Sequence, residues 1–158
     1  MNNKKNIKLY IMINQAIIAC LYVTLSFLSI PLAFGSFQIR LSEGLCVLPI
    51  FSSSNIFGIS LGCFLTNFLL YGNIIDMIFG TIATVIGGIG TYYFRKNYIL
   101  SCAIPIISNT IIIPLVLKYA YGFGELYIIM VIQMFISEFL SIGLIGRVVI
   151  YVQSRFQK

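Results

Sequence analysis

The sequence contains no histidine and no tryptophan, and it has few charged residues: 9 % of its 158 residues are charged and 4 are acidic. Histidine is the side chain that enzymes use most often for acid–base chemistry near neutral pH. The sequence also has no HExxH motif, no glycine-rich phosphate-binding loop and no nucleophile next to a base. We therefore expect a protein that is not an enzyme and that cannot hydrolyse ATP by itself.

The shortage of charge is matched by an excess of apolar residues, which make up 59 % of the chain and give a mean hydropathy of +1.01. Water-soluble domains have about 25 % charged residues, so a soluble protein is excluded. The apolar runs are rich in Ile, Leu and Phe and do not alternate with polar residues, which favours transmembrane helices over barrel strands. The length allows at most about six or seven spans of about 20 residues. We expect them to form a single domain over residues 1–158.

The basic residues, which give a net charge of +6, form three clusters at the ends of apolar runs, at residues 4–8, 95–96 and 147–158. Binding to nucleic acid would need a basic stripe along one surface, so we expect no nucleic-acid partner. Clusters at the ends of apolar runs instead mark the cytoplasmic side of a multi-pass membrane protein.

The apolar runs predict six helices, at about residues 9–30, 39–54, 56–71, 74–94, 98–117 and 124–150. The second run is too short to cross a bilayer by hydropathy alone. The three basic clusters, however, can lie on one side of the membrane only if an even number of crossings separates them, so the second run must cross as well. We therefore expect a six-helix bundle in the cell membrane with both termini in the cytoplasm. No small-residue cleavage site follows the first run, so we expect it to remain as a helix.

The four cysteines lie singly within apolar runs and lack the spacing of metal ligands: Cys20, Cys46, Cys63 and Cys102. No histidine is present to complete a metal site. We expect these cysteines to act as small buried hydrophobic residues, and we expect neither a metal nor another cofactor.

Glu138 lies near the middle of the last apolar run. An ionised acid at that depth costs roughly 2.5–3.5 kcal/mol on insertion scales, so it needs a partner, a proton or a ligand. It can pair with another helix and serve assembly alone, or it can belong to a binding site. Asn67 and Asn109, each within a long apolar run, present the same choice between interhelical hydrogen bonds and amides that line a cavity.

Arg40 and Glu43 are three residues apart at the start of the short second run, so on a helix they project from the same face. They can form an interfacial ion pair that reaches the external headgroups, or they can open a binding site. Asp76 lies at the start of the fourth run. An acid in the first turn of a helix can complement the helix dipole or can take part in binding.

Ala16, Cys20 and Thr24 recur every four residues in the first run and form one narrow face of small side chains. Such a face lets a second helix approach closely. The approaching helix can belong to the same bundle or to a foreign subunit. Two glycine-containing faces, at residues 58–62 and 80–88, are expected to pack within the bundle.

The segment FQIRLSEGLCVLPIF at residues 37–51 resembles the QueT family, whose members are predicted substrate-binding S components of energy-coupling factor transporters for queuosine precursors. The likeness continues along the chain at Gly62, Asn67, 76–81 (DMIFGT), Ala83, Thr84, Asn109, Pro114 and Glu138. The resemblance implies a six-helix S component that acts with a transmembrane T subunit and two separate ATPases. It also implies that the first helix docks on the T subunit through small side chains, and Ala16 and Cys20 have that spacing.

The resemblance leads to the hypothesis that the bundle binds a 7-deazaguanine, such as queuine or its aminomethyl precursor, near the external face. The ring offers N–H and amine donors and a carbonyl acceptor, so carboxylates and amides are suitable readers. Glu138 or Glu43 would accept from the donors, and Arg40 would orient Glu43 or the carbonyl. The remaining contacts would be the amides of Gln38, Asn67 and Asn109, the rings of Phe37 and Phe79, and Asp76 beside a cationic amine.

Three alternatives stay open. An S component could bind another small heterocycle or a vitamin with the same polar groups. A proton-coupled secondary transporter could use Glu138 as its proton site. A purely structural membrane subunit would use these polar residues for assembly alone.

Overall fold

The computed structural model describes residues 2–34, 37–122 and 124–156, with the backbone alone for residues 2–4, 33–34, 37–38, 71 and 156. Four helices are long and apolar enough to cross a membrane: Lys5–Leu32, Ile74–Tyr93, Tyr98–Tyr119 and Tyr127–Arg155. Two shorter apolar helices, Leu41–Ile50 and Asn55–Leu70, lie between the first two of these in sequence. The prediction of a helical membrane protein is therefore confirmed.

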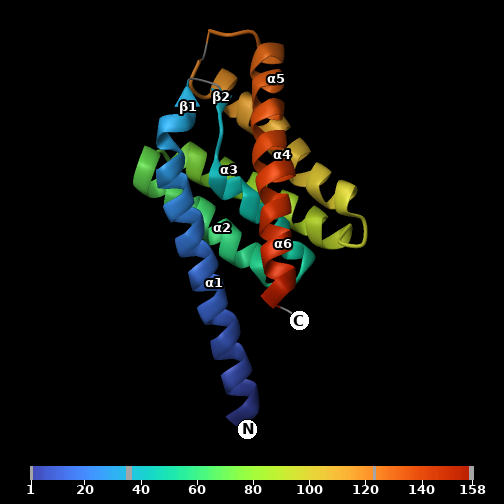
Figure 1. Ribbon diagram of the computed structural model, residues 1–158. Helices are drawn as coiled ribbons and strands as arrows, with labels where there is room; N and C mark the ends of the chain where they lie inside the picture. The colour runs from blue at the N-terminus through green and yellow to red at the C-terminus, as the bar shows by residue number, and fades with distance from the viewer. Residues whose placement is uncertain (1, 35–36, 123, 157–158) are drawn as a thin grey trace.

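The first helix, α1 (Asn2–Ser29), continues into a single 3₁₀ turn, η1 (Ile30–Leu32). Pro31 ends the α-helix, because proline disfavours helical backbone in the residue before it. The chain then reverses through a short antiparallel ladder between β1 (Ala33–Phe34) and β2 (Phe37–Gln38). This ladder brings the chain back toward the bundle (Figure 1).

The remaining elements are helical: η2 (Leu41–Ile50), α2 (Asn55–Thr66), η3 (Asn67–Tyr71), α3 (Ile74–Tyr93), α4 (Tyr98–Tyr119), α5 (Tyr127–Glu138), η4 (Phe139–Ile145) and α6 (Gly146–Phe156). η2 is a 3₁₀ helix, whereas η3 and η4 are π-helical. α5, η4 and α6 follow one another without a break and form one rod (Figure 1). The second predicted helix is thus a ten-residue 3₁₀ helix, and the last one extends beyond residue 150 to Phe156.

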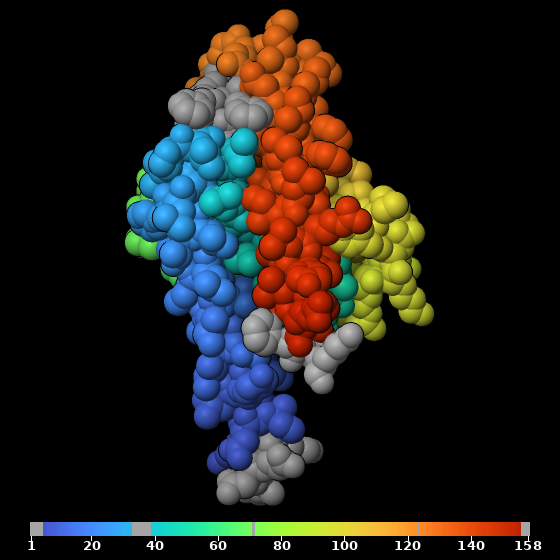
Figure 2. Space-filling view, in the orientation of Figure 1, coloured from blue at the N-terminus to red at the C-terminus, as the bar shows by residue number. Residues whose placement is uncertain are grey.

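η2 lies at the centre of the bundle, where it contacts α1, α2, α3, α4, η4 and α6. Its residues 42–49 are buried, and Figure 2 shows only a narrow strip of this region between α1 and the α5–η4–α6 rod. Runs of 3₁₀ helix longer than about 3–4 residues are uncommon. Here Gly44 and Pro49 both disfavour an α-helix, and a Cβ atom on Gly44 would lie 2.7 Å from the Ile145 side chain. η2 is therefore a tightly enclosed element and not a surface loop.

Glycines bring α1, α2 and α3 into close contact. A Cβ atom on Gly62 of α2 would lie 2.6 Å from the Cβ atom of Tyr22, and one on Gly58 would lie 2.7 Å from the Gln15 side chain. On α3, a Cβ atom on Gly80 would lie 2.7 Å from the Nδ2 atom of Asn67 in η3. The prediction that these glycine-containing faces pack within the bundle is therefore confirmed.

The two chain ends lie toward the same end of the bundle in Figure 1, and the N-terminal part of α1 projects beyond the other helices. The β1–β2 ladder and the connection between α4 and α5 lie toward the opposite end. η2 starts next to this ladder, so the beginning of η2 reaches into the bundle from the end opposite the termini.

Candidate functional site

Two glutamates are buried within the bundle. Glu43 lies in the first turn of η2, and Glu138 is the last α-helical residue of α5, immediately before the π-helical segment η4. Each is only 2 % exposed. Carboxyl groups are almost never buried without partners, because the loss of water is costly. The partners of these two acids therefore define the site.

The carboxylate of Glu43 is held by three donors from three different elements. The Tyr22 hydroxyl of α1 donates to its Oε1 atom at 2.5 Å. Its Oε2 atom accepts from Sγ of Cys46 at 3.1 Å and from Nδ2 of Asn109 in α4 at 3.4 Å. Both oxygens of Glu43 are therefore occupied, and the side chain is fixed in place.

Glu138 has a different environment. The Asn109 side chain also hydrogen-bonds to it, and Glu43 and Arg40 act on it electrostatically. Its Oε2 atom is buried but has no hydrogen-bond partner among the described residues. A buried polar atom without a partner costs about 1–3 kcal/mol, more for a charged group, and calls for an explanation. The simplest explanation is that a ligand donates a hydrogen bond to this oxygen or that the carboxyl group carries a proton.

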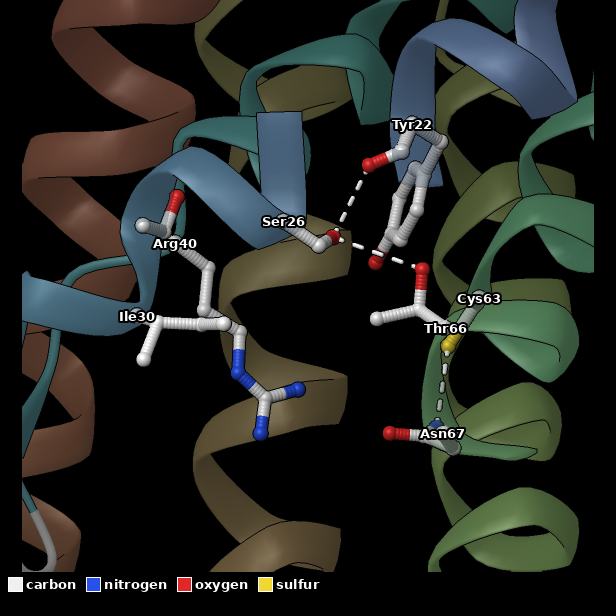
Figure 3. Close-up of a pocket in the computed structure, with 8 residues that line it drawn as sticks. Tyr22, Ser26, Ile30, Arg40, Cys63, Thr66 and Asn67 are labelled. Atoms are coloured by element: carbon white, nitrogen blue, oxygen red, sulfur yellow. Dashed lines mark hydrogen bonds between the residues drawn. The ribbon is translucent and has the colours of Figure 1, made fainter. Parts of the chain in front are cut away.

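Arg40 connects this pair of acids to a small cavity beside α1. Figure 3 shows the Arg40 side chain passing Ile30, with its guanidinium group in the space that faces the Asn67 amide. The cavity measures about 10 Å³, roughly the room that one water molecule needs. Its lining comes from α1, η1, α2, η3 and the residue just before η2, and it consists of Tyr22, Ser26, Ser29, Ile30, Arg40, Cys63, Thr66 and Asn67.

Hydroxyl groups line the side of the cavity that belongs to α1. Ser26 donates to Oγ of Ser42 in η2 at 2.7 Å and accepts from the Thr66 hydroxyl at 3.4 Å. Oγ of Ser29 accepts from the backbone N–H of Leu41 at 2.8 Å. α1 and η2 therefore meet through hydrogen bonds at this level, and not through apolar packing alone.

Asn67 is 2 % exposed and opens the π-helical segment η3. Its Nδ2 atom donates to the backbone carbonyl of Asp76 at 3.0 Å, and its carbonyl oxygen faces the cavity in Figure 3. π-helical segments are rare and often mark functional sites. Here one starts at Asn67 and another directly follows Glu138.

The structure brings Arg40, Glu43, Asn67, Asn109 and Glu138 together, but it places Asp76 and Phe79 elsewhere. The Asp76 carboxylate accepts from the Tyr121 hydroxyl at 2.7 Å near the surface. Phe79 is 45 % exposed and lines an open groove between α3 and α4. Both therefore lie outside the group of residues around the buried acids.

The backbone of Phe37 and Gln38 forms β2, just before Arg40. The predicted roles of both residues depend on their side chains, which lie outside the described part of the chain. Their place in the sequence puts them at the entrance to η2.

Tyr121 belongs to the connection between α4 and α5. Its partial removal from water and the neighbouring Asp76 carboxylate raise the pKa of its hydroxyl above the ordinary value. The hydrogen bond therefore ties this connection to the start of α3.

Sequence reasoning missed Tyr22 and Cys46, which hold Glu43, and the hydroxyls of Ser26, Ser29 and Ser42. A signal for the α1 residues is present: Gln15, Tyr22, Ser26 and Ser29 recur at spacings of 3, 4 or 7 residues, so they share one face of the helix. All four are buried. A polar stripe inside an otherwise apolar helix predicts a polar neighbour.

The face formed by Ala16, Cys20 and Thr24 lies on another side of α1. All three residues are exposed and line a shallow groove along the helix with Ile13, Ile17 and Leu21. Cys20 is thus exposed, contrary to our expectation of a buried cysteine, whereas Cys46, Cys63 and Cys102 are buried as predicted. Within the described ranges no three potential metal ligands gather at one point.

Comparison with known proteins matches the chain to a protein family. The family model described as QueT transporter matches residues 12–155. The chain belongs to the QueT transporter family. QueT proteins are transporters and not enzymes, which confirms the expectation that catalysis is absent. No curated protein and no solved structure matches this QueT chain.

Proposed function

We propose that this QueT protein is the substrate-binding S component of an energy-coupling factor transporter in the cell membrane and that it imports a queuosine precursor. The observation that carries the proposal is the buried, unpartnered Oε2 atom of Glu138. It lies beside Asn109, which hydrogen-bonds to both buried acids. The arrangement is a carboxylate that is ready to accept from a ligand.

The chemistry of a 7-deazaguanine fits this arrangement. Its ring N–H and exocyclic amine are adjacent donors, and a carboxylate accepts two adjacent donors well. The Glu138 carboxylate would accept both donors of this edge. Asn109 would lie next to Glu138, and Glu43 would hold Asn109 from the side away from the ligand. The Asn67 amide and the Arg40 guanidinium would lie near the carbonyl and the ring nitrogens.

The other residues of the predicted site take outer roles in this proposal. Phe37 and Gln38 would contact the ligand from the entrance to η2. Asp76 and Phe79 lie outside the buried group, so we assign them no contact with the bound ligand. The cavity of about 10 Å³ is far smaller than a purine-like base. Arg40 would therefore move aside as the ligand enters.

We further propose six membrane crossings with both termini in the cytoplasm. The 3₁₀ winding of η2 supports the short second crossing, since a rise of about 2.0 Å per residue gives ten residues a length of about 20 Å, against about 15 Å for an α-helix. The extended backbone at β2 and Arg40 adds about 3.3 Å per residue. Together these segments approach the thickness of a hydrocarbon core, about 30 Å.

Energy would come from two ATPases and a transmembrane T subunit. The exposed small side chains of Ala16, Cys20 and Thr24 support docking of a T-subunit helix on α1, because small side chains allow close approach. We expect Cys20→Trp to abolish uptake and leave ligand binding by the isolated protein unchanged. Loss of binding in that variant would argue against a separate docking face.

The proposal is tested by calorimetry or thermal shift on the purified protein with queuine and the aminomethyl deazaguanine. We expect binding by the wild type and a strong loss in Glu138→Gln, which keeps the shape but removes the charge. Asp76→Asn is the matched control at a surface acid and should bind normally. Absence of any effect of the deazaguanines on the wild type would refute the choice of ligand.

The second candidate is a proton-coupled secondary transporter, which the pair of buried acids also favours. Uptake that continues without the ATPases and stops with a proton uncoupler would support this candidate and contradict the S-component role.

A further inference from the structure

Tyr22 connects α1, the helix on which we propose that the T subunit docks, to the proposed ligand site. It is fully buried, at 1 % exposure, and its hydroxyl donates to Glu43 at 2.5 Å. Glu43 accepts from Asn109, and Asn109 hydrogen-bonds to Glu138. The four side chains form a continuous relay from α1 through η2 and α4 to α5. The relay ends at the carboxyl group whose Oε2 atom has no partner in the described part of the chain.

The Tyr22 hydroxyl determines which oxygen of Glu43 accepts from Asn109. A hydrogen bond from a hydroxyl to a carboxylate is short and strong, and this one occupies Oε1. Oε2 is left to accept from the Asn109 Nδ2 atom. Because Oε2 of Glu43 accepts this hydrogen bond, the NH₂ group of Asn109, and not its carbonyl, faces the two acids.

The position of the Tyr22 ring is itself constrained. The missing side chain of Gly62 leaves room for it, since a Cβ atom there would lie 2.6 Å from the Tyr22 Cβ and 2.9 Å from its Cγ. One turn further along α1, Ser26 bonds to Ser42 of η2. A phenylalanine would fill the same apolar space, so packing does not account for the hydroxyl.

We propose that Tyr22 is a positioning residue for ligand recognition: through Glu43 and Asn109 it aligns the Glu138 carboxylate with the amine-bearing edge of the ligand. The inference rests on the proposed function, because the ligand must present donors to Glu138. It adds a residue of α1 to the site. Recognition then depends on the position of the same helix that carries the exposed Ala16, Cys20 and Thr24.

The test compares Tyr22→Phe with the wild type on two ligands, 7-deazaguanine and 7-deazahypoxanthine, which lacks the exocyclic amine. Loss of a hydrogen bond to a charged group typically weakens an interaction by about tenfold or more. We expect a loss of that size for 7-deazaguanine and less than about twofold for 7-deazahypoxanthine. Tyr98→Phe is the matched control, since it removes a partly buried hydroxyl that donates to the Gly143 carbonyl at 3.4 Å. It should leave the ratio of the two affinities unchanged.

Equal losses for both ligands would leave the ratio of the two affinities unchanged and would overturn the proposal, because Tyr22 would then support the fold alone. A second measurement tests the relay without a ligand. Infrared carboxyl bands assigned with Glu43→Gln and Glu138→Gln should both shift when Tyr22 is replaced by phenylalanine or by 3-fluorotyrosine, which keeps the hydroxyl. A Glu138 band that shifts in neither protein would refute the relay. Failure of the wild type to bind any deazaguanine, with the bands shifting as expected, would instead refute the proposed ligand alone.

Discussion

The molecule contains two hydrogen bonds of the same kind, from a tyrosine hydroxyl to a carboxylate, in two different settings. Tyr22 donates to Glu43 at 2.5 Å inside the bundle. Tyr121 donates to Asp76 at 2.7 Å near the surface, where it ties the α4–α5 connection to α3. In the first setting the carboxylate has further partners and a second acid nearby. The second bond lies at the surface, next to water.

The same pair of residue types therefore has two different roles, and the burial of the carboxylate distinguishes them: the buried bond belongs to the proposed binding site, and the exposed bond only connects two segments of the fold. A surface hydrogen bond that breaks is replaced by bonds to water, so little free energy is lost. A buried carboxylate has no such substitute, and its partners must come from the protein or from a ligand. Of Glu43, Asp76 and Glu138, only Glu138 has a buried oxygen that lacks a partner among the described residues.

The largest effect is expected from Glu138→Gln. Removing the charge at the unpartnered oxygen should weaken binding of the aminomethyl deazaguanine by roughly 10- to 100-fold, the range for hydrogen bonds to charged groups. Asp76→Asn, the surface counterpart, should change it by less than about twofold. Titration calorimetry on both variants measures the contrast, and equal effects would abolish the distinction between the two settings.

The next largest effect is expected on stability, when the space that Gly62 leaves for the Tyr22 side chain is filled. Gly62→Ala adds a Cβ atom 2.6 Å from the Cβ of Tyr22. Overpacking of this kind typically destabilises by about 1–3 kcal/mol. Gly124→Ala is the control, because no described atom lies within 4 Å of the added Cβ. It should change stability by less than about 0.5 kcal/mol. Unfolding in detergent measures both variants, and a neutral Gly62→Ala would show that α1 can shift freely.

A smaller effect is expected at the surface tie. Tyr121→Phe removes the hydrogen bond to Asp76 and should lower the free energy of unfolding by less than about 1 kcal/mol. Tyr22→Phe should lower it by about 1–3 kcal/mol, because a buried acceptor loses its donor. Parallel unfolding curves for the two variants give the order, and the reverse order would contradict the role assigned to burial.

The smallest effect is the pH dependence of the surface tie. The pKa of Tyr121 is raised in the folded protein, so its contribution is fully present below the ordinary tyrosine pKa of about 10. It is lost as the pH rises through the higher folded-state value. The difference in melting temperature between wild type and Tyr121→Phe should therefore be constant from pH 7 to about 9 and shrink above the ordinary value. A difference that grows at high pH would contradict the cause given for the pKa.

The sequence was sufficient to predict the helical membrane class and to single out Glu43, Asn109 and Glu138, because polar residues are rare in its apolar runs. It could not predict that Tyr22 and Cys46 hold Glu43, since a tyrosine or cysteine in such a run usually packs as an apolar residue. It also placed Asp76 in the predicted ligand site, whereas the Asp76 carboxylate bonds to Tyr121 near the surface. Spacing along a helix fixes which residues share a face, but it does not fix which neighbour that face meets.

The winding of η2 has a consequence for how its neighbours are separated. In a 3₁₀ helix the side chains at positions i and i+3 eclipse, so η2 is a three-sided column. One side carries Ser42, Leu45 and Leu48 and faces α1 or the groove that α1 shares with α6. A second side carries Glu43 and Cys46, which bond to each other. The third carries Gly44 and Val47, which meet Ile145 and Gly146 at the junction of η4 and α6. The Glu43 side also reaches α1, through Tyr22. Two sides of η2 therefore hold α1 and the third holds the junction of η4 and α6, so a substitution at Gly44 or Val47 can loosen that junction while α1 stays bonded to the other two sides.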